Sequence, residues 1–568
     1  MRWAPLLFVP SPLELSGLAT IFENNPQASS AHATDLRFTP HYPARSSLDD
    51  VLLLVPLGTD EYVNEKYAAQ IGARLTEWSV ALKATPPALD VLERFVHSTI
   101  AANSLNPREQ RSVRSDYGIE VVRRHFAGTV SGREQFLQQI KAYFAGTSEI
   151  ETAEFEIIRI EEPKGAAPVC PVDIRYDLVA KRKDNTREQR VGVWRTHWEQ
   201  SQSTGWQVRR WEFTEETLSR ISGPVFIDIS ARVLGQTDSY RAQLLHGTDY
   251  WRTVLDGACG IDVYGNNGLA VGDFDNDGFD DLYVCQPSGL PNRLYQNRGD
   301  GTFEDVTEKA GVGVLDNTSC ALFADFENKG VQDLLVVCDT GPLLFLNEGN
   351  GKYSLKRDAF KFSQPPQGSF THAAIADYDH DGRLDIYFCL YNYYVGLDQY
   401  RYPVPYFDAR NGPPNFLFHN EGNATFQERT EAAGLNKDND RYSFACAWGD
   451  CNGNGWPDLY VANDFGRSNL YRNNGDGTFT SISSEAGVED VGAGMSACWF
   501  DFDNDGRQDI YVANMWSAAG LRVSQQDRFQ QNEPETIRAL YRQHARGNSL
   551  YRNQGSGKFQ NVSEQSHA

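Results

Sequence analysis

The feature of this sequence that most restricts its fold is a segment repeated five times between residues 266 and 568. Each copy runs from an apolar stretch into an aspartate-rich loop and out again, as in GLAVGDFDNDGFDDLYV at 268–284. A second shared block, of the type RLYQNRGDGTFEDVT, follows each copy. Steps of 52, 52, 73 and 51 residues separate the first loop aspartates, which are Asp273, Asp325, Asp377, Asp450 and Asp501. Such a period predicts one supersecondary unit per repeat.

Each repeat offers four short strand candidates, which in the first repeat are 268–274, 281–284, 293–297 and 302–307. Tight polar turns join them, and the glycines of NRGDGTF permit the positive φ that a short hairpin needs. Four antiparallel strands of this length make one propeller blade, whereas a β-sandwich gives no reason for a fixed period. We therefore predict a mainly β fold, a β-propeller built of four-stranded blades with calcium-binding loops, preceded by a smaller α+β domain.

The loop between the first two strands of a repeat has the pattern D-x-D-x-D-G-x-x-D. Alternate carboxylates on a tight loop point toward one centre, and calcium takes about six to eight oxygen ligands in flexible geometry. Magnesium requires a stricter octahedron and keeps its waters, so it fits less well. An EF-hand would need a glutamate at loop position 12, where this chain has the apolar residues Val284, Phe388, Val461 and Val512.

The five loops are predicted to differ in calcium binding. Lys329 in the second loop is expected to replace the cation by a salt bridge, and the fourth loop, with two asparagines, is expected to bind more weakly. Three to four Ca²⁺ sites follow, with the ligands Asp273, Asp275, Asp277, Asp281, Asp377, Asp379, Asp381, Asp385, Asp450, Asn452, Asn454, Asp458, Asp501, Asp503, Asp505 and Asp509. The alternative is that the loops are only turns, but turn chemistry explains one aspartate and one glycine, not four crowded carboxylates.

These motifs resemble the FG-GAP/VCBS repeats of integrin α-subunit propellers. With DLYVAN at 458–463 and LYRNNGDGTF at 470–479, they also resemble the cartilage acidic protein (ASPIC/UnbV-associated) family and its bacterial relatives. The resemblance covers about 266–568 and implies a calcium-binding propeller with a role in adhesion or ligand binding. Integrin propellers usually have seven blades, so the five visible repeats leave open a five-bladed ring, further blades upstream or a truncated chain.

We expect the chain to be organised as an N-terminal region (1–57), an α+β domain (58–220), a connector (221–265) and the propeller (266–568). Apolar spacing predicts helices over 61–82, 87–102 and 131–144, the last capped by Ser131. Alternating residues predict a strand at 117–126 and an antiparallel sheet from 154–162, 171–183, 189–200 and 206–214. This order of elements resembles nuclear-transport-factor-2-like and SnoaL-like proteins.

Two insertions, 391–414 and 514–547, lie between the second and third strands of their repeats. In an up-and-down blade this places both on the face opposite the aspartate loops. Aromatic and arginine side chains are favoured at binding hot spots. The candidate ligand residues are Tyr394, Tyr400, Tyr402, Trp516, Arg522 and Arg528. The alternative is that the insertions pack on each other or on the N-terminal domain.

The sequence favours a binding or adhesion module that recognises a protein or glycan. A net charge of −23 argues against nucleic acid as a partner, and no apolar run is long enough for a transmembrane segment. Common catalytic and nucleotide-binding motifs are absent, but a hydrolase or lyase on the insertion face, or a scaffold, stays open. Calcium affinities of extracellular modules suit an extracytoplasmic location, although the N-terminus makes a poor signal peptide. The cysteines, such as Cys285 and Cys498, are expected to be buried thiols.

Overall fold

The computed structural model describes residues 62–163, 169–201, 205–223, 226–246, 250–251, 268–393 and 402–566. The chain divides into two compact units. The N-terminal unit comprises Met1–Ile227 and Ala518–Asn532, and the C-terminal unit comprises Asp228–Ser517 and Glu533–Ala568. The predicted fold class is confirmed: the chain is mainly β, with a series of blade-like antiparallel sheets after an N-terminal α+β region.

The N-terminal unit is built on an eight-stranded sheet with the order β2-β3-β8-β7-β6-β5, in which β1 pairs with β8 and β4. Its elements are α3 (Asn64–Lys83), η1 (Leu89–Arg94), β1 (Val96–Ala102), β2 (Pro107–Asp116), β3 (Ile119–Phe126), β4 (Val130–Ser131), α4 (Arg133–Tyr143), β5 (Thr147–Ile160), β6 (Val169–Arg182), β7 (Arg187–Ser201), β8 (Gly205–Ile221) and α9 (Ala518–Ser524).

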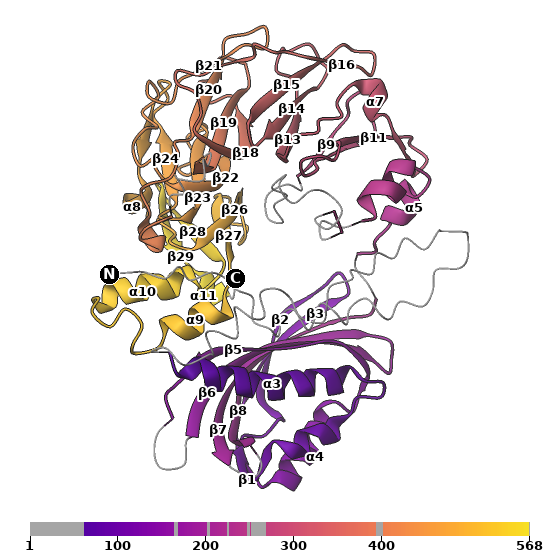
Figure 1. Ribbon diagram of the computed structural model, residues 1–568, viewed down its shortest axis with the longest axis vertical. Helices are drawn as coiled ribbons and strands as arrows, with labels where there is room; N and C mark the ends of the chain where they lie inside the picture. The colour runs from indigo at the N-terminus through magenta and orange to yellow at the C-terminus, as the bar shows by residue number, and fades with distance from the viewer. Residues whose placement is uncertain are drawn as a thin grey trace. The chain divides into compact units, whose positions relative to one another are not determined.

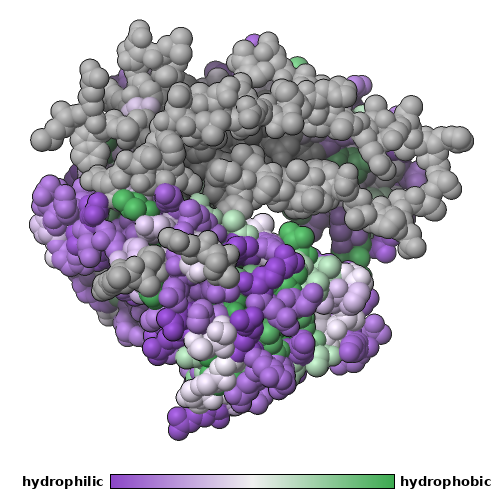
Figure 2. All heavy atoms as spheres, turned by 60° about the horizontal axis from the view of Figure 1, so that its bottom comes forward, coloured by the Kyte–Doolittle hydropathy of each residue, from purple (hydrophilic) through white to green (hydrophobic). Residues whose placement is uncertain are grey.

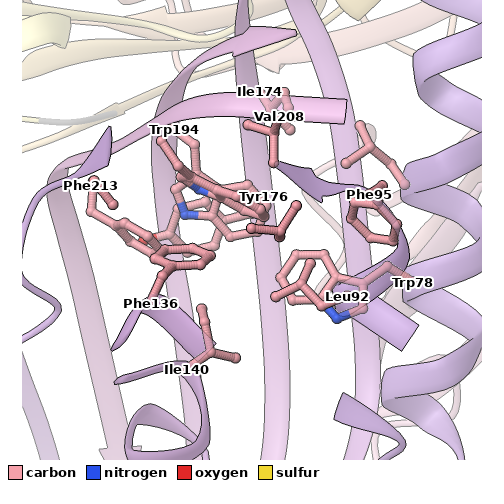
Figure 3. Packing of buried hydrophobic residues seen from close by; sticks show 14 of the residues in the cluster. Trp78, Leu92, Phe95, Phe136, Ile140, Ile174, Tyr176, Trp194, Val208 and Phe213 are labelled. Carbon is pink, nitrogen blue, oxygen red and sulfur yellow. The ribbon is translucent and has the colours of Figure 1, made fainter. Parts of the chain in front are cut away.

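Aromatic rings fill the core of this unit (Figure 3). Trp78 of α3 stacks on Phe155 with ring centroids 4.9 Å apart, and it meets Trp211 edge-on at 5.5 Å. Trp194 and Trp211 lie 4.9 Å apart. Burial alternates along β6 because successive strand residues point to opposite faces of the sheet. On the face that comes forward in Figure 2, hydrophilic residues predominate around smaller hydrophobic patches.

Two local predictions for this unit were wrong. The segment 96–102, predicted as the end of a helix, is strand β1, because its pairing with β8 and β4 outweighs the helical spacing of its apolar residues. Ser131 lies in β4 and does not cap α4, whose N-cap is Gly132 at φ 90°. Glycine adopts this backbone conformation without strain, so the helix begins one residue later than the serine suggested.

In the described part of the C-terminal unit there are five antiparallel sheets in which consecutive strands are neighbours. A further short strand, β17 (Phe360–Lys361), joins the third sheet beside β21. The blade strands are β9 (Leu269–Gly272), β10 (Asp281–Val284), β11 (Arg293–Asn297) and β12 (Phe303–Asp305); β13 (Thr318–Ala324), β14 (Asp333–Cys338), β15 (Gly341–Asn347) and β16 (Tyr353–Leu355); β18 (Gly368–Ala376), β19 (Asp385–Tyr393), β20 (Phe416–Asn420) and β21 (Phe426–Glu428); β22 (Tyr442–Gly449), β23 (Asp458–Phe465), β24 (Asn469–Asn473) and β25 (Phe479–Ser481); β26 (Ala493–Phe500), β27 (Asp509–Met515), β28 (Ser549–Gly555) and β29 (Lys558–Asn561).

Short helices connect the sheets or lie in the insertions. They are α5 (Ser230–Leu234), η2 (Tyr240–Leu244), α7 (Thr307–Ala310), η4 (Tyr406–Asp408), α8 (Ser483–Ala486), α10 (Glu535–His544) and α11 (Ser563–Ser566). None of the helices in the described part of the chain is long and apolar enough to cross a membrane.

The sheets follow one another along an arc, each with its first strand on the inner side (Figure 1). The first strands of successive sheets contact one another, from β9 through β13, β18 and β22 to β26. A separate apolar cluster fills each junction between neighbouring sheets. This stacking of four-stranded sheets around inner first strands is that of propeller blades.

The described cysteines are free thiols, and all but one are buried as expected. Cys498 is the exception, because it lies on a face of β26 that no later blade covers among the described residues. Cys259 lies outside the described residues.

Candidate functional site

The five Asp loops, numbered one to five, are 273–281, 325–333, 377–385, 450–458 and 501–509. Loop one turns around its first carboxylate: Asp273 accepts the backbone N–H groups of Asp277 (3.0 Å) and Gly278 (2.9 Å). The backbone is left-handed at Asn276 (φ 57°) and Gly278 (φ 89°), where asparagine and glycine are tolerated. The same pair of bonds recurs in the other loops. The first aspartate therefore shapes the turn.

The last aspartate of each loop is buried at the start of the second strand. Asp281 is 0% exposed and accepts the backbone N–H groups of Phe274 (3.0 Å) and Asn297 (2.7 Å). Burial raises the pKa of Asp281 to about 6, and burial raises that of Asp385 in loop three to about 7. A nearby cation would favour the ionised form of each buried carboxyl and so lower these pKa values.

The third loop position distinguishes a cation site from a turn. Asp275, Asp379 and Asp503 stand there, and the Oδ1 atom of each is buried with no hydrogen-bond partner among the residues that the structure describes. A buried, unpaired carboxylate oxygen is costly, and a hard cation that binds oxygen removes that cost. One ligand oxygen from each member of a triad lies within 4.8 Å of the other two. The triads consistent with Ca²⁺ sites are Asp273/Asp275/Asp281, Asp377/Asp379/Asp385 and Asp501/Asp503/Asp509.

The aspartates at the fifth loop position form hydrogen bonds or ion pairs with other residues of the same loop. The Oδ1 atom of Asp277 accepts the backbone N–H of Phe279 at 2.9 Å. In loop three the carboxylate of Asp381 pairs with Arg383, and in loop five that of Asp505 pairs with Arg507. Asp381 also belongs to a further group that could hold a cation, together with Asp379 and His419, whereas Asp277 and Asp505 lie outside the triads named above. The role of the fifth-position aspartates as ligands stays a prediction.

Loops two and four differ from the full sets, as their sequences indicate. In loop two the ammonium of Lys329 lies 2.5 Å from Glu327 Oε2, so the predicted internal salt bridge is present. In loop four the side-chain oxygen of Asn452 accepts the backbone N–H of Asn454 at 3.0 Å. That oxygen is therefore engaged in the turn, unlike Oδ1 of Asp275 in loop one. Weaker cation binding by loop four stays a prediction.

In blades one, three and five, a residue on the third strand also reaches the Asp loop, and the sequence pattern did not predict it. Gln296 Nε2 donates to Asp275 Oδ2 at 2.5 Å, and Arg552 Nη2 lies 2.6 Å from Asp503 Oδ2. His419 Nε2 lies 3.2 Å from an oxygen of Asp379. One feature of the sequence could have predicted this contact. The third strands read RLYQN, LLFLN, FLFHN, NLYRN and SLYRN, and the residue before the final asparagine differs between repeats whereas the asparagine itself recurs.

The loops also connect neighbouring blades. Asn276 of loop one donates to the carbonyl of Gly330 in loop two at 2.8 Å, and Asn328 of loop two donates to Gly382 in loop three at 2.8 Å. Between loops three and four, the rings of His380 and Trp456 stack with centroids 4.1 Å apart. The Asp loops therefore form one connected edge of the propeller.

The six candidate ligand residues are not brought together in the described part of the chain. Tyr394 and Tyr400 lie outside the described residues, and Tyr402 (55% exposed) and Trp516 (36% exposed) belong to the C-terminal unit.

Arg522 and Arg528 belong to the N-terminal unit. The guanidinium of Arg522 pairs with Glu65 at 2.8 Å and donates to the carbonyl of Ile157 at 2.9 Å. Arg528 pairs with Glu162 at 3.1 Å. A shared ligand site for the six residues stays a prediction.

The two insertions pack on each other in the C-terminal unit, which was the alternative left open by the sequence. Phe407 of η4 meets Tyr541 of α10 edge-on at 4.9 Å. Beside this contact is a polar pocket of about 370 Å³ between the first insertion and the fourth blade. Its walls include Asp408, Arg410, Lys437, Asp438, Arg441, Arg467, Ser483 and Glu489.

Most charges in this pocket are paired with one another. Arg441 lies 2.5 Å from Asp408, Arg467 lies 3.2 Å from Glu489, and Arg410 lies 2.9 Å from Asp438. Fixed acids and bases that alternate around a small cavity offer hydrogen-bond donors and acceptors to a polar ligand. The sequence did not single out this pocket, because its walls come from separate segments of the chain.

The FG-GAP-like repeat family matches three stretches of this chain, 273–336, 325–388 and 450–512. These stretches contain all five Asp loops in full, including loops one, three and five with their complete carboxylate sets. The chain carries FG-GAP-like repeats. The first match spans loops one and two, so it includes the loop of this chain in which Lys329 stands where the full loops have a carboxylate.

The repeats are also similar to curated relatives over part of the chain. Cartilage acidic protein 1 of Xenopus tropicalis is 36% identical over 134 residues, which is 23% of this chain and 20% of that protein. The Homo sapiens protein of the same name is 33% identical over 134 residues, again 23% of this chain and 20% of that protein. The chain thus matches about a fifth of the length of these relatives.

Two solved structures show weaker likeness. A lectin of Agrocybe aegerita, described as recognising non-reducing terminal N-acetylglucosamine, is 16% identical over 52% of this chain and 65% of its own, with a TM-score of 0.31. A nuclear transport factor 2-like protein of Salmonella enterica is 10% identical over 29% of this chain and 94% of its own, with a TM-score of 0.19. TM-scores this low do not establish a shared fold, and the resemblance predicted for 58–220 stays a prediction.

Proposed function

We propose that the C-terminal unit is a calcium-stabilised propeller that recognises a glycan or a protein outside the cytoplasm. The observation that carries the calcium part is the buried, unpaired carboxylate oxygen at the third position of loops one, three and five. The FG-GAP-like repeats support the same interpretation. Sites with the modest affinity of extracellular calcium modules would be filled where free calcium is abundant.

Calcium in these loops would stabilise the folded propeller rather than take part in a catalysed reaction. Each full set carries four carboxylates, and the loops also link neighbouring blades. At a free calcium concentration ten times Kd, each site would add about 1.4 kcal/mol to the free energy of unfolding. Three such sites would add roughly 4 kcal/mol, which is a large part of the stability of an ordinary domain.

The ligand is proposed to bind at the pocket beside the first insertion. Sugar hydroxyls both donate and accept hydrogen bonds, so a wall of alternating carboxylates, guanidinium groups and serine hydroxyls suits them. Arg467 lines the pocket and is only partly exposed, with a side-chain exposure of 29%. A glycan, free or on a protein, is therefore the proposed ligand class.

A glycan array probed with the labelled full-length chain, with calcium and with a chelator, tests this proposal. We expect the wild type to retain a set of glycans in calcium, and Arg467→Ala to lose at least tenfold in apparent affinity while its melting temperature stays close to that of the wild type. The matched control is Arg298→Ala, which removes an exposed arginine of blade one that pairs with Glu304.

Failure of the wild type to retain any glycan would contradict the ligand class. Retention by Arg467→Ala equal to that of the wild type would place the site away from the pocket.

A further inference from the structure

Loops one and five carry the same four carboxylates, yet their triads face different side chains from the third strand of the blade. In both blades this side chain comes directly before the recurring asparagine of the third strand: it is Gln296 of β11 in the first blade and Arg552 of β28 in the fifth. Both reach the third-position aspartate, the residue with the unpaired oxygen. The two loops therefore differ in what lies against this carboxylate, and loop five also has the Arg507–Asp505 pair where loop one has Phe279.

The neighbour of loop one is a neutral amide. Gln296 Nε2 donates to Asp275 Oδ2 at 2.5 Å and leaves Oδ1 free to bind a cation. A carboxamide adds no positive charge, and by rotation it can also present its own oxygen to calcium. Nothing in this contact opposes a cation in loop one.

The neighbour of loop five is a fixed cation. Arg552 Nη2 lies 2.6 Å from Asp503 Oδ2 and 3.6 Å from Asp505 Oδ2. A guanidinium group stays charged at any pH that the protein survives, so calcium must either displace it or bind beside it. Both routes weaken binding, since like charges repel and a carboxylate already paired attracts a second cation less strongly.

We propose that the residue before the third-strand asparagine sets the calcium affinity of each Asp loop, so that loop one binds tightly and loop five weakly. The inference rests on the calcium sites of the proposed function. The side chain of Arg552 is 42% exposed, so water screens part of its charge. Because calcium is a dication, the remaining repulsion is expected to separate the affinities of the two loops by about tenfold to a hundredfold. Loop four, with Arg472 at the same strand position, falls on the weak side.

Calcium titration of the chelator-stripped full chain by isothermal calorimetry tests the inference through reciprocal variants. Arg552→Gln is expected to tighten calcium binding by loop five at least tenfold and so move it out of the weak class, and Gln296→Arg to weaken binding by loop one by a similar factor. Each loop is assigned by a variant that removes it: Asp275→Asn should abolish the tight class in the wild type, and Asp503→Asn should remove a site from the weak class.

The double variant Gln296→Arg/Arg552→Gln gives the sharpest outcome. Its calcium isotherm should match that of the wild type, but Asp503→Asn should now remove the tight class. Arg552→Met keeps the length of the side chain without its charge and should also tighten loop five. The Arg552→Met variant replaces Arg552→Gln in the test if Arg552→Gln proves less stable than the wild type, as shown by a lower melting temperature in chelator.

The two proposals fail in different ways. No calcium binding by the wild type would contradict the calcium part of the proposed function. Calcium binding that none of the Gln296 or Arg552 variants changes would overturn the inference alone and leave the calcium centres in place.

Discussion

The side-chain amide of Asn473 donates a 2.8 Å hydrogen bond to the backbone carbonyl of Tyr378, which lies in the Asp loop of the preceding blade. The backbone N–H of the same asparagine donates to Asp458 at 2.7 Å, the last carboxylate of its own loop. One residue thus ties two consecutive loops together. The same inter-blade bond links Asn347 to Phe274 (2.7 Å), Asn420 to Phe326 (3.0 Å) and Asn553 to Cys451 (3.0 Å).

Replacing Asn473 with alanine should destabilise the propeller by about 1–3 kcal/mol, because it leaves the buried carbonyl of Tyr378 without its partner. The control is Asn297→Ala in the first blade. The side chain of Asn297 makes the bonds within its own blade, to Asp280 and Gly299, but no inter-blade bond among the described residues. Urea denaturation in saturating calcium compares the two, and equal losses of stability would mean that the inter-blade bond contributes nothing.

Replacing Asp275 with asparagine should remove one calcium site and leave stability in chelator unchanged or higher. The substitution removes a negative charge from a crowded triad, and it leaves at most a neutral amide oxygen where the unpaired carboxylate oxygen stood, so a cation is held much less strongly. Calorimetric stoichiometry and the calcium-induced rise in melting temperature report both effects. The exposed Asp280, outside the D-x-D-x-D pattern, is the matched control: Asp280→Asn should keep every site. An unchanged stoichiometry for Asp275→Asn would refute the triad as a ligand set.

Loop two should be convertible into a calcium site. Lys329 stands where the full loops have an aspartate, and it pairs with Glu327. Its ammonium group therefore supplies positive charge that a bound cation would supply in the full loops. The double substitution Glu327→Asp/Lys329→Asp restores the D-x-D-x-D pattern. It should add one site to the calorimetric count, and it should lower the melting temperature in chelator because four carboxylates then repel one another. A count equal to that of the wild type would show that the carboxylate pattern alone is insufficient.

The blades and their loops were predictable because their determinants are local. The aspartates, glycines and strand residues of one loop lie within 17 consecutive positions, as in 268–284, and the repeat shows the same pattern five times. The role of Gln296 and Arg552 was not predictable in the same way. These residues meet their loop only after β11 or β28 pairs with the second strand of its blade.

Features that depend on packing between distant segments were also missed. The segment 96–102 has apolar residues at helical spacing, but it is a strand because β8, more than a hundred residues later, pairs with it. The pocket beside Arg467 forms only where the first insertion meets the fourth blade. Arg522 was expected to bind a ligand, yet Glu65, which no sequence pattern connects to it, pairs with its guanidinium.

One buried carboxyl on the insertion side of the fourth blade should make stability depend on pH. Asp464 is 3% exposed; its Oδ2 accepts the hydroxyl of Tyr391, and its Oδ1 has no hydrogen-bond partner among the described residues. Burial raises its pKa to about 7. Between about pH 4 and pH 7 the folded chain keeps this proton while the unfolded chain has released it, so stability falls as pH rises through that window.

Replacing Asp464 with asparagine should remove this loss. A shift of about three pKa units corresponds to roughly 4 kcal/mol, so Asp464→Asn should be more stable than the wild type at pH 8 by a few kcal/mol and similar to it at pH 4.5. Urea denaturation at both pH values, with calcium held at saturation, measures the difference, and Asp280→Asn should follow the wild type. If the gap between Asp464→Asn and the wild type is the same at both pH values, then Asp464 does not retain its proton in the folded chain.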